Sequence, residues 1–171
     1  MICYHGSDTV VNIPKILNAK RPLDFGGGFY VTTNKTQAIK WAKKVAFRNN
    51  SKYKYVNCYE FDIKKAELEL IVIKFEVADE QWLDFICDNR TGKDTGEYDI
   101  VIGPVADDSV YRVVVEYENG DIDKEQAIKK MKTENLYDQI LFHNDKSLRY
   151  IKYIDTEVVV NEWTQLWNTS L

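Results

Sequence analysis

Three short segments of the sequence combine residues that can hydrogen-bond and stack on a small ligand. They are Tyr4-His5-Gly6-Ser7, the run DFGGGFYVT at 24–32 and the run DQILF at 138–142. His5 can hydrogen-bond a hydroxyl group, and the backbone of Gly6 can pair with an amide, with no side chain to keep the ligand away. The ring of Tyr30 can stack on a planar group, presented by the tight turn that Gly26–Gly28 allow. Each segment is typical of a strand or a strand edge.

The combined pattern resembles the H-Y-E class of ADP-ribosyltransferases, the branch of diphtheria toxin and the poly(ADP-ribose) polymerases. The HGS strand and the G-x-G-F-Y strand are the first two signatures of that class, and Trp41 lies where it often places a second ring. A closer resemblance, to the bacterial DUF3990 family, covers almost the whole chain. Members of that family are thought to be ADP-ribosyltransferase-like, and some occur beside small partner proteins in toxin–antitoxin-like pairs. The segments that carry it are YHGS, DFGGGFYVT, QAIKWA, WLDFICDNR, YDIVIGPVADD and DQILF.

This resemblance implies a fold and a function. The fold is a single α+β domain over residues 1–171, with an ADP-ribosyltransferase-like split antiparallel β-sheet core and flanking helices. The function is transfer of one ADP-ribose from NAD⁺, bound as the substrate, to a macromolecular acceptor that is a protein or a nucleic acid, with a toxin-like role and a small antitoxin-like partner. The implied catalytic residues are His5, Tyr30 and Gln139. The implied NAD⁺-binding residues are His5, Gly6, Ser7, Phe25, Gly28, Tyr30, Thr32 and Trp41.

The chemistry of NAD⁺ cleavage fits these residue types. The nicotinamide ring must be gripped, and the ribose must be held while positive charge develops at its anomeric carbon. Gly6 would pair with the carboxamide and His5 would bond a ribose hydroxyl. Tyr30 and Trp41 would stack on the ring, and stacking contributes about 1–3 kcal/mol per ring. We therefore expect His5, Tyr30 and Gln139 to converge on one cleft.

Gln139 departs from the H-Y-E pattern, because it stands where that class has its catalytic glutamate. A glutamine keeps the hydrogen bond to the ribose but lacks the charge, and removing one such electrostatic interaction costs about 10²–10³ in rate. Poly(ADP-ribose) synthesis is therefore not expected, whereas single transfer is compatible with H-Y-x members of the class. Three alternatives stay open: an NAD⁺ glycohydrolase, a weakened module that only binds NAD⁺ or ADP-ribose, and an interaction protein whose cleft holds a partner.

Structural roles compete with these assignments. Tyr30 suits a core tyrosine, Trp41 lies on the apolar stripe of a helix, and the glycine turn lacks the GK[ST] ending of a phosphate-binding loop. His143 with Asp145 is expected at the surface. A second polar cluster either holds an Arg90–carboxylate ion pair that fixes a loop or forms a wall of the acceptor site. It consists of Asp84, Asn89, Arg90, Asp99, Asp107 and Asp108. We expect no metal site, since adjacent Asp107 and Asp108 alone are too few ligands.

Length and composition limit the class of protein. The 171 residues suit one domain, and 44% hydrophobic with 29% charged residues is typical of a globular chain. The net charge of −4 argues against a duplex-DNA clamp, although a local basic patch is compatible with it. Cys3, Cys58 and Cys87 lack zinc-site spacing and are expected as reduced thiols of a cytoplasmic protein. The start MICYHGSD lacks signal-peptide features, and no apolar run is long enough to span a membrane, so no membrane association is expected.

The spacing of apolar residues predicts the elements that position these segments. Asn34 with Gln37, Asp79, and Asp123 with Gln126 are the expected helix caps. Helices are predicted at about 34–47, at 79–89 and from 123, with a helical turn within 9–17 and a short helix at 161–171. The apolar stripe of the first helix is predicted to be Ala38, Trp41, Ala42, Val45 and Ala46. Strands are predicted at 1–5, 29–32, 54–63, 68–75, 99–105, 111–118, 139–142 and 150–160.

Overall fold

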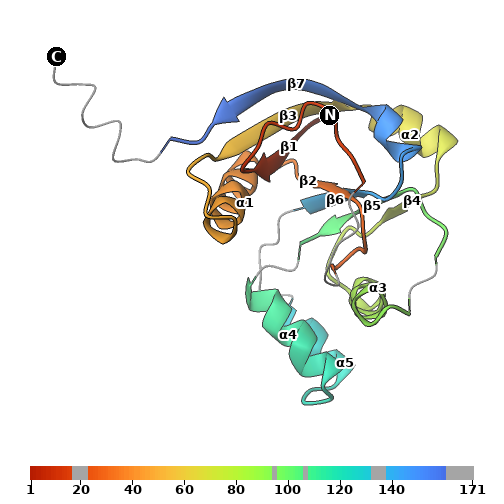
Figure 1. The fold of residues 1–171 in the computed structure, drawn as a ribbon. Coiled ribbons are helices and arrows are strands. Elements are labelled where there is room, and N and C mark those ends of the chain that lie inside the picture. The colour runs from red at the N-terminus through yellow and green to blue at the C-terminus, as the bar shows by residue number, and fades with distance from the viewer. Residues whose placement is uncertain (17–22, 94–95, 106–107, 132–137, 161–171) are drawn as a thin grey trace. The chain divides into compact units, whose positions relative to one another are not determined.

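The computed structural model describes residues 1–16, 23–93, 96–105, 108–131 and 138–160, of which 108 and 109 are described in backbone only. Across these residues the chain forms a mixed α+β structure with two sheets and five α-helices (Figure 1). It divides into two compact units. Unit 1 comprises Met1–Ile13, Val31–Phe61 and Lys152–Leu171, and unit 2 comprises Pro14–Tyr30 and Asp62–Ile151. That residues 1–171 act as one domain stays a prediction.

Unit 1 contains a three-stranded sheet in the order β1-β3-β7. Its strands are β1 (Ile2–Ser7), β3 (Tyr55–Phe61) and β7 (Ile151–Val158). β1 runs antiparallel to β3, with His5 opposite Asn57. Helix α1 (Lys35–Arg48) packs on β1 through three buried alanines, Ala38, Ala42 and Ala46. These small side chains let the helix backbone come very close to the strand.

The start of α1 is fixed by side-chain hydrogen bonds. The Asn34 side chain accepts from the backbone N–H of Gln37 at 2.9 Å, so the predicted cap is confirmed. The Gln37 side chain does not accept from the Asn34 N–H, as it would in a capping box. It accepts from the Thr32 hydroxyl at 2.9 Å, and that hydroxyl accepts from the Asn34 N–H at 3.0 Å. Thr32 therefore completes the capping arrangement.

Unit 2 contains a four-stranded sheet in the order β2-β6-β5-β4. The strands are β2 (Phe29–Val31), β6 (Asp138–Phe142), β5 (Ile100–Pro104) and β4 (Val72–Lys74). β5 pairs antiparallel with β6 but parallel with β4, so this sheet is mixed rather than purely antiparallel as expected. Five helical segments accompany it: α2 (Ile63–Glu69), α3 (Glu80–Thr91), α4 (Asp108–Glu118), α5 (Lys124–Met131) and the 3₁₀ turn η1 (Ser147–Tyr150).

One apolar cluster holds unit 2 together. α3 contributes Trp82, Leu83 and Ile86, all fully buried, and the sheet contributes Val101 and Leu141. The predicted caps of α3 and α5 are confirmed: the Asp79 side chain accepts from Trp82 N–H, and Asp123 and Gln126 bond each other's backbone N–H groups. Burial of these apolar side chains supplies the main driving force for folding of this unit.

Three predicted elements are wrong. Residues 111–118 form the helix α4 rather than a strand, because Val110, Val113, Val114 and Tyr117 meet the core at helical spacing despite their β-branched character. The predicted strand 68–75 is split between the end of α2 and the three residues of β4. The described part of 9–17 contains no helical turn, and 161–171 lies outside the described residues.

The structure describes the state of the cysteines and the length and polarity of the helices. The three cysteines form no disulfide with one another. Burial, aided by the nearby Glu118 carboxylate, raises the pKa of Cys87 to about 11, so its thiol stays protonated at neutral pH. Within the described ranges, no helix combines the length and apolar character needed to cross a membrane.

Candidate functional site

The residues predicted to bind NAD⁺ are divided between the two units. His5, Gly6, Ser7, Thr32 and Trp41 belong to unit 1. Phe25, Gly28, Tyr30 and Gln139 belong to unit 2. Each group is described below by itself, and convergence of the two groups on one cleft stays a prediction.

The edge of β1 presents a backbone donor and acceptor at Gly6. Met1 and Phe61 exchange both backbone hydrogen bonds, at 2.8 and 2.6 Å. Hydrogen-bonded pairs alternate along an antiparallel ladder, so the odd-numbered residues of β1 direct their N–H and C=O groups toward β3. Tyr4 instead bonds Thr32 on the other side, at 2.8 and 3.0 Å, through an isolated bridge. Two residues on, the N–H and C=O of Gly6 point to the same side as those of Tyr4, away from β3. An amide group, which needs one acceptor and one donor, matches this pair.

The missing side chain of Gly6 serves helix packing. A Cβ at Gly6 would lie 2.0 Å from the carbonyl oxygen of Ala38 and 2.7 Å from the nitrogen of Ala42. Helix α1 fills the space that a Cβ would occupy, and contact of Gly6 with a ligand stays a prediction. Any ligand contact of Gly6 must therefore be made through its backbone at the strand edge.

The His5 side chain lies on the sheet face opposite α1. Successive side chains of a strand point to opposite faces, and Gly6 faces α1. His5 is half-buried there, on the face that Asn57 shares as its cross-strand partner. At the end of the strand, the Ser7 hydroxyl accepts from the Thr9 N–H at 3.2 Å and so shapes the turn that follows.

Trp41 is separated from His5 by β1. Its side chain is 42% exposed on α1, and the Arg48 guanidinium lies over its ring, 5.2 Å from the centroid. The predicted apolar stripe is therefore wrong at Trp41, whereas the three alanines of the stripe are buried. Since α1 covers the Gly6 face of β1 and His5 points to the other face, unit 1 does not bring Trp41 and His5 together.

Asn57 positions the strand end that carries His5, and sequence reasoning missed it. Its side chain is fully buried and donates to the carbonyls of His5, at 3.4 Å, and Thr9, at 3.3 Å. It accepts from the Val11 N–H at 2.8 Å and from the Thr156 hydroxyl at 2.7 Å. The available signal was an asparagine in the middle of the strand YVNCYEF, where its low β-propensity calls for a specific reason.

We expect Asn57→Ala to lower the free energy of unfolding of unit 1 by about 1–3 kcal/mol, because it removes a fully buried side chain and its part-buried hydrogen bonds to the backbone of His5, Thr9 and Val11. Urea denaturation followed by circular dichroism measures this difference. Asn119→Ala, at an exposed turn asparagine, is the matched control and should stay within about 0.5 kcal/mol of wild type. Equal stability of the two variants would contradict the positioning role of Asn57.

The glycine turn before β2 is held by the side chain of Tyr30. Its hydroxyl donates to the Gly26 carbonyl at 2.6 Å and accepts from the Phe25 N–H at 3.2 Å. Burial raises the pKa of Tyr30 well above its usual value, so the phenol is neutral. Gly28 has a φ of +153°, and a Cβ there would lie 2.3 Å from the Phe142 carbonyl oxygen. Phe25 is fully buried in the core of unit 2. The turn is therefore a fixed structure.

Gln139 is a buried amide on β6 directly opposite Gly103 of β5. Its side chain is 9% exposed, and among the described residues its Nε2 atom has no hydrogen-bond partner. A buried N–H group without a partner costs about 1–3 kcal/mol. A hydroxyl group of a bound ligand would remove this cost. β6 is adjacent to β2, the strand of Tyr30, in the sheet.

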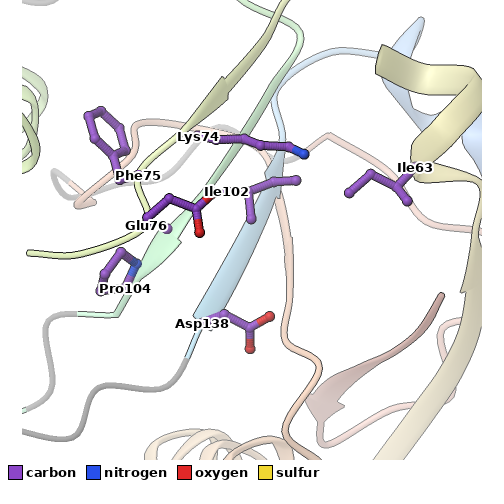
Figure 2. A pocket seen from close by; sticks show the side chains of 8 residues that line it. Ile63, Lys74, Phe75, Glu76, Ile102, Pro104 and Asp138 are labelled. Atoms are coloured by element: carbon purple, nitrogen blue, oxygen red, sulfur yellow. The ribbon is translucent and has the colours of Figure 1, made fainter. Parts of the chain in front are cut away.

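A small cavity lies at the ends of β4, β5 and β6. Its volume is about 240 Å³, below the roughly 300–1,000 Å³ of most small-molecule sites. Figure 2 shows Lys74, Glu76 and Asp138 among its lining side chains. Lys74 forms an ion pair with Glu67. None of the predicted NAD⁺-binding residues lines this cavity, and it is too small to enclose a dinucleotide.

The second polar cluster separates into structural pairs. Arg90 forms its ion pair with Glu118, at 3.4 Å, and its guanidinium stacks on Tyr111, 4.4 Å from the ring centroid. Arg90 therefore does form an ion pair with a carboxylate, but the partner lies outside the predicted cluster and the pair joins α3 to α4 rather than fixing a loop. Asp84 instead pairs with Lys124 at 2.9 Å, and Asn89 accepts from the Tyr98 hydroxyl at 3.2 Å. Asp107 lies outside the described residues, as does the side chain of Asp108.

Asp99 anchors the loop after β6. Its side-chain oxygens accept from the Ile71 N–H at 2.9 Å, from Asn144 at 2.9 Å and from Lys146 at 3.2 Å. Burial alone would raise the pKa of Asp99, but these hydrogen bonds outweigh burial and hold it below its usual value. His143, expected at the surface, is half-buried against Tyr98, and its Nδ1 lies 3.0 Å from the Gly27 carbonyl oxygen. It therefore supports the glycine turn.

Comparison with known proteins gives one result. The family model described as a protein of unknown function, DUF3990, matches residues 1–153. Neither curated proteins nor solved structures gave a significant match. The described residues contain no group of three or more His, Cys, Asp or Glu side chains arranged to hold a metal ion.

Proposed function

The chain belongs to the DUF3990 family, and on that premise we propose that it is an NAD⁺-dependent mono-ADP-ribosyltransferase. We also propose that its two sheets correspond to the split β-sheet core of that enzyme class. One observation carries it: the N–H and C=O of Gly6, directly beside His5, are directed away from β3 at the edge of β1. This is the arrangement that a nicotinamide carboxamide requires.

In the proposed reaction, the Gly6 N–H donates to the carboxamide oxygen and the Gly6 carbonyl accepts from the carboxamide nitrogen. His5 hydrogen-bonds a hydroxyl of the adjoining ribose. The proposal also requires the Tyr30 ring, which belongs to unit 2, to support the nicotinamide. The bond between the ribose anomeric carbon and the nicotinamide nitrogen breaks, and its electron pair neutralises the pyridinium ring. The acceptor nucleophile then bonds the anomeric carbon and loses its proton.

Gln139 has a defined place in this proposal. Its buried Nε2 group would donate to a ribose hydroxyl, which removes the cost of an unpartnered amide. Because an amide carries no charge, it stabilises the positive ribose less than a glutamate would. We therefore expect transfer of a single unit at a modest rate.

A second candidate function is an NAD⁺- or ADP-ribose-binding module without chemistry. The neutral Gln139 favours it, since the nearest carboxylate on the same strand, Asp138, is the neighbouring residue and strand alternation directs it to the opposite face. Both candidates require binding of NAD⁺ and differ in the release of nicotinamide.

Titration calorimetry with NAD⁺ tests the shared requirement. We expect His5→Ala to weaken binding by about 0.5–1.5 kcal/mol, the usual net contribution of one hydrogen bond. Trp41→Ala is the matched control and should leave NAD⁺ affinity unchanged, since Trp41 lies across β1 from His5. Absence of binding to folded wild-type protein would contradict the proposal, as would equal losses in the two variants.

A further inference from the structure

The outer face of α1 and the segment that follows it carry a concentration of positive charge. Residues 35–54 contain seven of the 23 Lys and Arg residues of the chain and none of its 27 Asp and Glu residues, although the net charge of the whole chain is −4. This segment lies entirely within unit 1, where α1 (orange in Figure 1) follows one face of the sheet. The charge is therefore local and is opposite in sign to that of the rest of the chain.

Helix geometry places these charges together with aromatic rings. Side chains three, four and seven positions apart share one face of a helix, and the buried alanines define the inward face of α1. The side chains on the outward face, which with two residues of the following segment we call the α1 surface, are all exposed. The α1 surface consists of Lys40, Trp41, Lys43, Lys44, Phe47, Arg48, Lys52 and Tyr53.

The aromatic side chains of the α1 surface are accessible and lie among cations. Trp41, Phe47 and Tyr53 are 42%, 88% and 51% exposed. Arg48 lies over Trp41, and the Lys52 ammonium is 5.1 Å from the Tyr53 ring centroid. Tyr53 also stacks on Tyr55, with 6.2 Å between centroids and 19° between ring planes. Several exposed rings gathered on one cationic face are typical of an interaction site.

We propose that the α1 surface binds single-stranded nucleic acid. Its lysines and arginine would neutralise phosphates and release counterions, and its rings would stack on unpaired bases, whose faces are accessible only outside a duplex. An anionic membrane would also attract the charge. However, a helix that lies in a membrane interface buries its apolar face in lipid, and the apolar face of α1 is packed on β1. This proposal goes beyond the NAD⁺ site and does not depend on it.

Fluorescence polarisation of a 20-nucleotide fluorescein-labelled oligouridine RNA tests the proposal with the full chain. We expect the triple variant Lys40→Gln, Lys43→Gln, Arg48→Gln to weaken binding at least 10-fold in 100 mM NaCl. The slope of log Kd against log salt should fall by about 2, because each phosphate that is no longer neutralised lowers it by about 0.7. Equal effects in the control Lys64→Gln, Lys65→Gln, Lys93→Gln, which removes three exposed lysines of unit 2, would overturn it.

The aromatic variants separate stacking from charge attraction. Trp41→Ala and Tyr53→Ala should each weaken RNA binding about fivefold or more. A duplex of the same length should bind more weakly than the single strand. Unchanged RNA affinity in both aromatic variants, duplex binding as tight as single-strand binding, or tighter binding to phosphatidylserine vesicles than to RNA would each overturn the proposal.

Discussion

Replacing Gly6 by alanine is expected to destabilise unit 1 by about 3 kcal/mol or more. The new Cβ would lie 2.0 Å from the Ala38 carbonyl oxygen and 2.7 Å from the Ala42 nitrogen, well inside contact distance. Both atoms belong to the helix backbone, so no side chain can rotate away, and α1 must move from β1. Overpacking in a well-packed core costs about 1–3 kcal/mol, and a collision with backbone belongs at the upper end of that range or beyond it.

Thermal and urea denaturation measure this effect, and another glycine of the predicted motifs provides the control. At this chain length, 1 kcal/mol corresponds to a shift of about 2–4 °C in Tm. Gly27→Ala should be close to neutral, because a Cβ at Gly27 meets no atom within 4 Å. If Gly6→Ala is as stable as Gly27→Ala, α1 does not pack on β1 as the structure describes.

The local rules of the sequence predicted much of the fold. Asn34, Asp79 and Asp123 begin their helices as expected, since capping depends on neighbouring residues alone. The strand predicted at 111–118 was wrong because long-range packing, rather than neighbouring residues, decides the structure there. The β-branched content of VYRVVVEY favours a strand, but the core selects the helix that buries Val110 and Val114 on one face. Tertiary packing overrides propensity there.

The site was less accessible to sequence reasoning, because the roles of its residues depend on which face is covered. The motif identified His5 and Gly6, but only the position of α1 shows that Gly6 faces the helix and His5 the opposite side. Long-range partners explain the remaining differences. Asn57 bonds Thr156, 99 positions away, and His143 bonds the glycine turn 116 positions away. No local spacing rule contains such information.

The largest effect on chemistry is expected at Gln139. Gln139→Glu introduces a carboxylate where the proposal places developing positive charge, which should raise NAD⁺ cleavage by up to about 10²-fold, the usual worth of such an interaction. Gln139→Ala removes the neutral hydrogen bond and should slow cleavage by the equivalent of about 0.5–1.5 kcal/mol. His5→Ala should impair binding in either background, because it acts on the bound ribose rather than on the charge. Circular dichroism establishes that each variant is folded.

Release of nicotinamide from NAD⁺ by purified wild-type, Gln139→Glu and Gln139→Ala proteins is the most direct measurement of the central claim. The transferase account expects release by wild type, faster release by Gln139→Glu and slower release by Gln139→Ala. Equal rates in all three would place Gln139 away from the reacting ribose. No release from any folded variant would contradict the transferase account, and if all three variants still bind NAD⁺, the chain is a binding module.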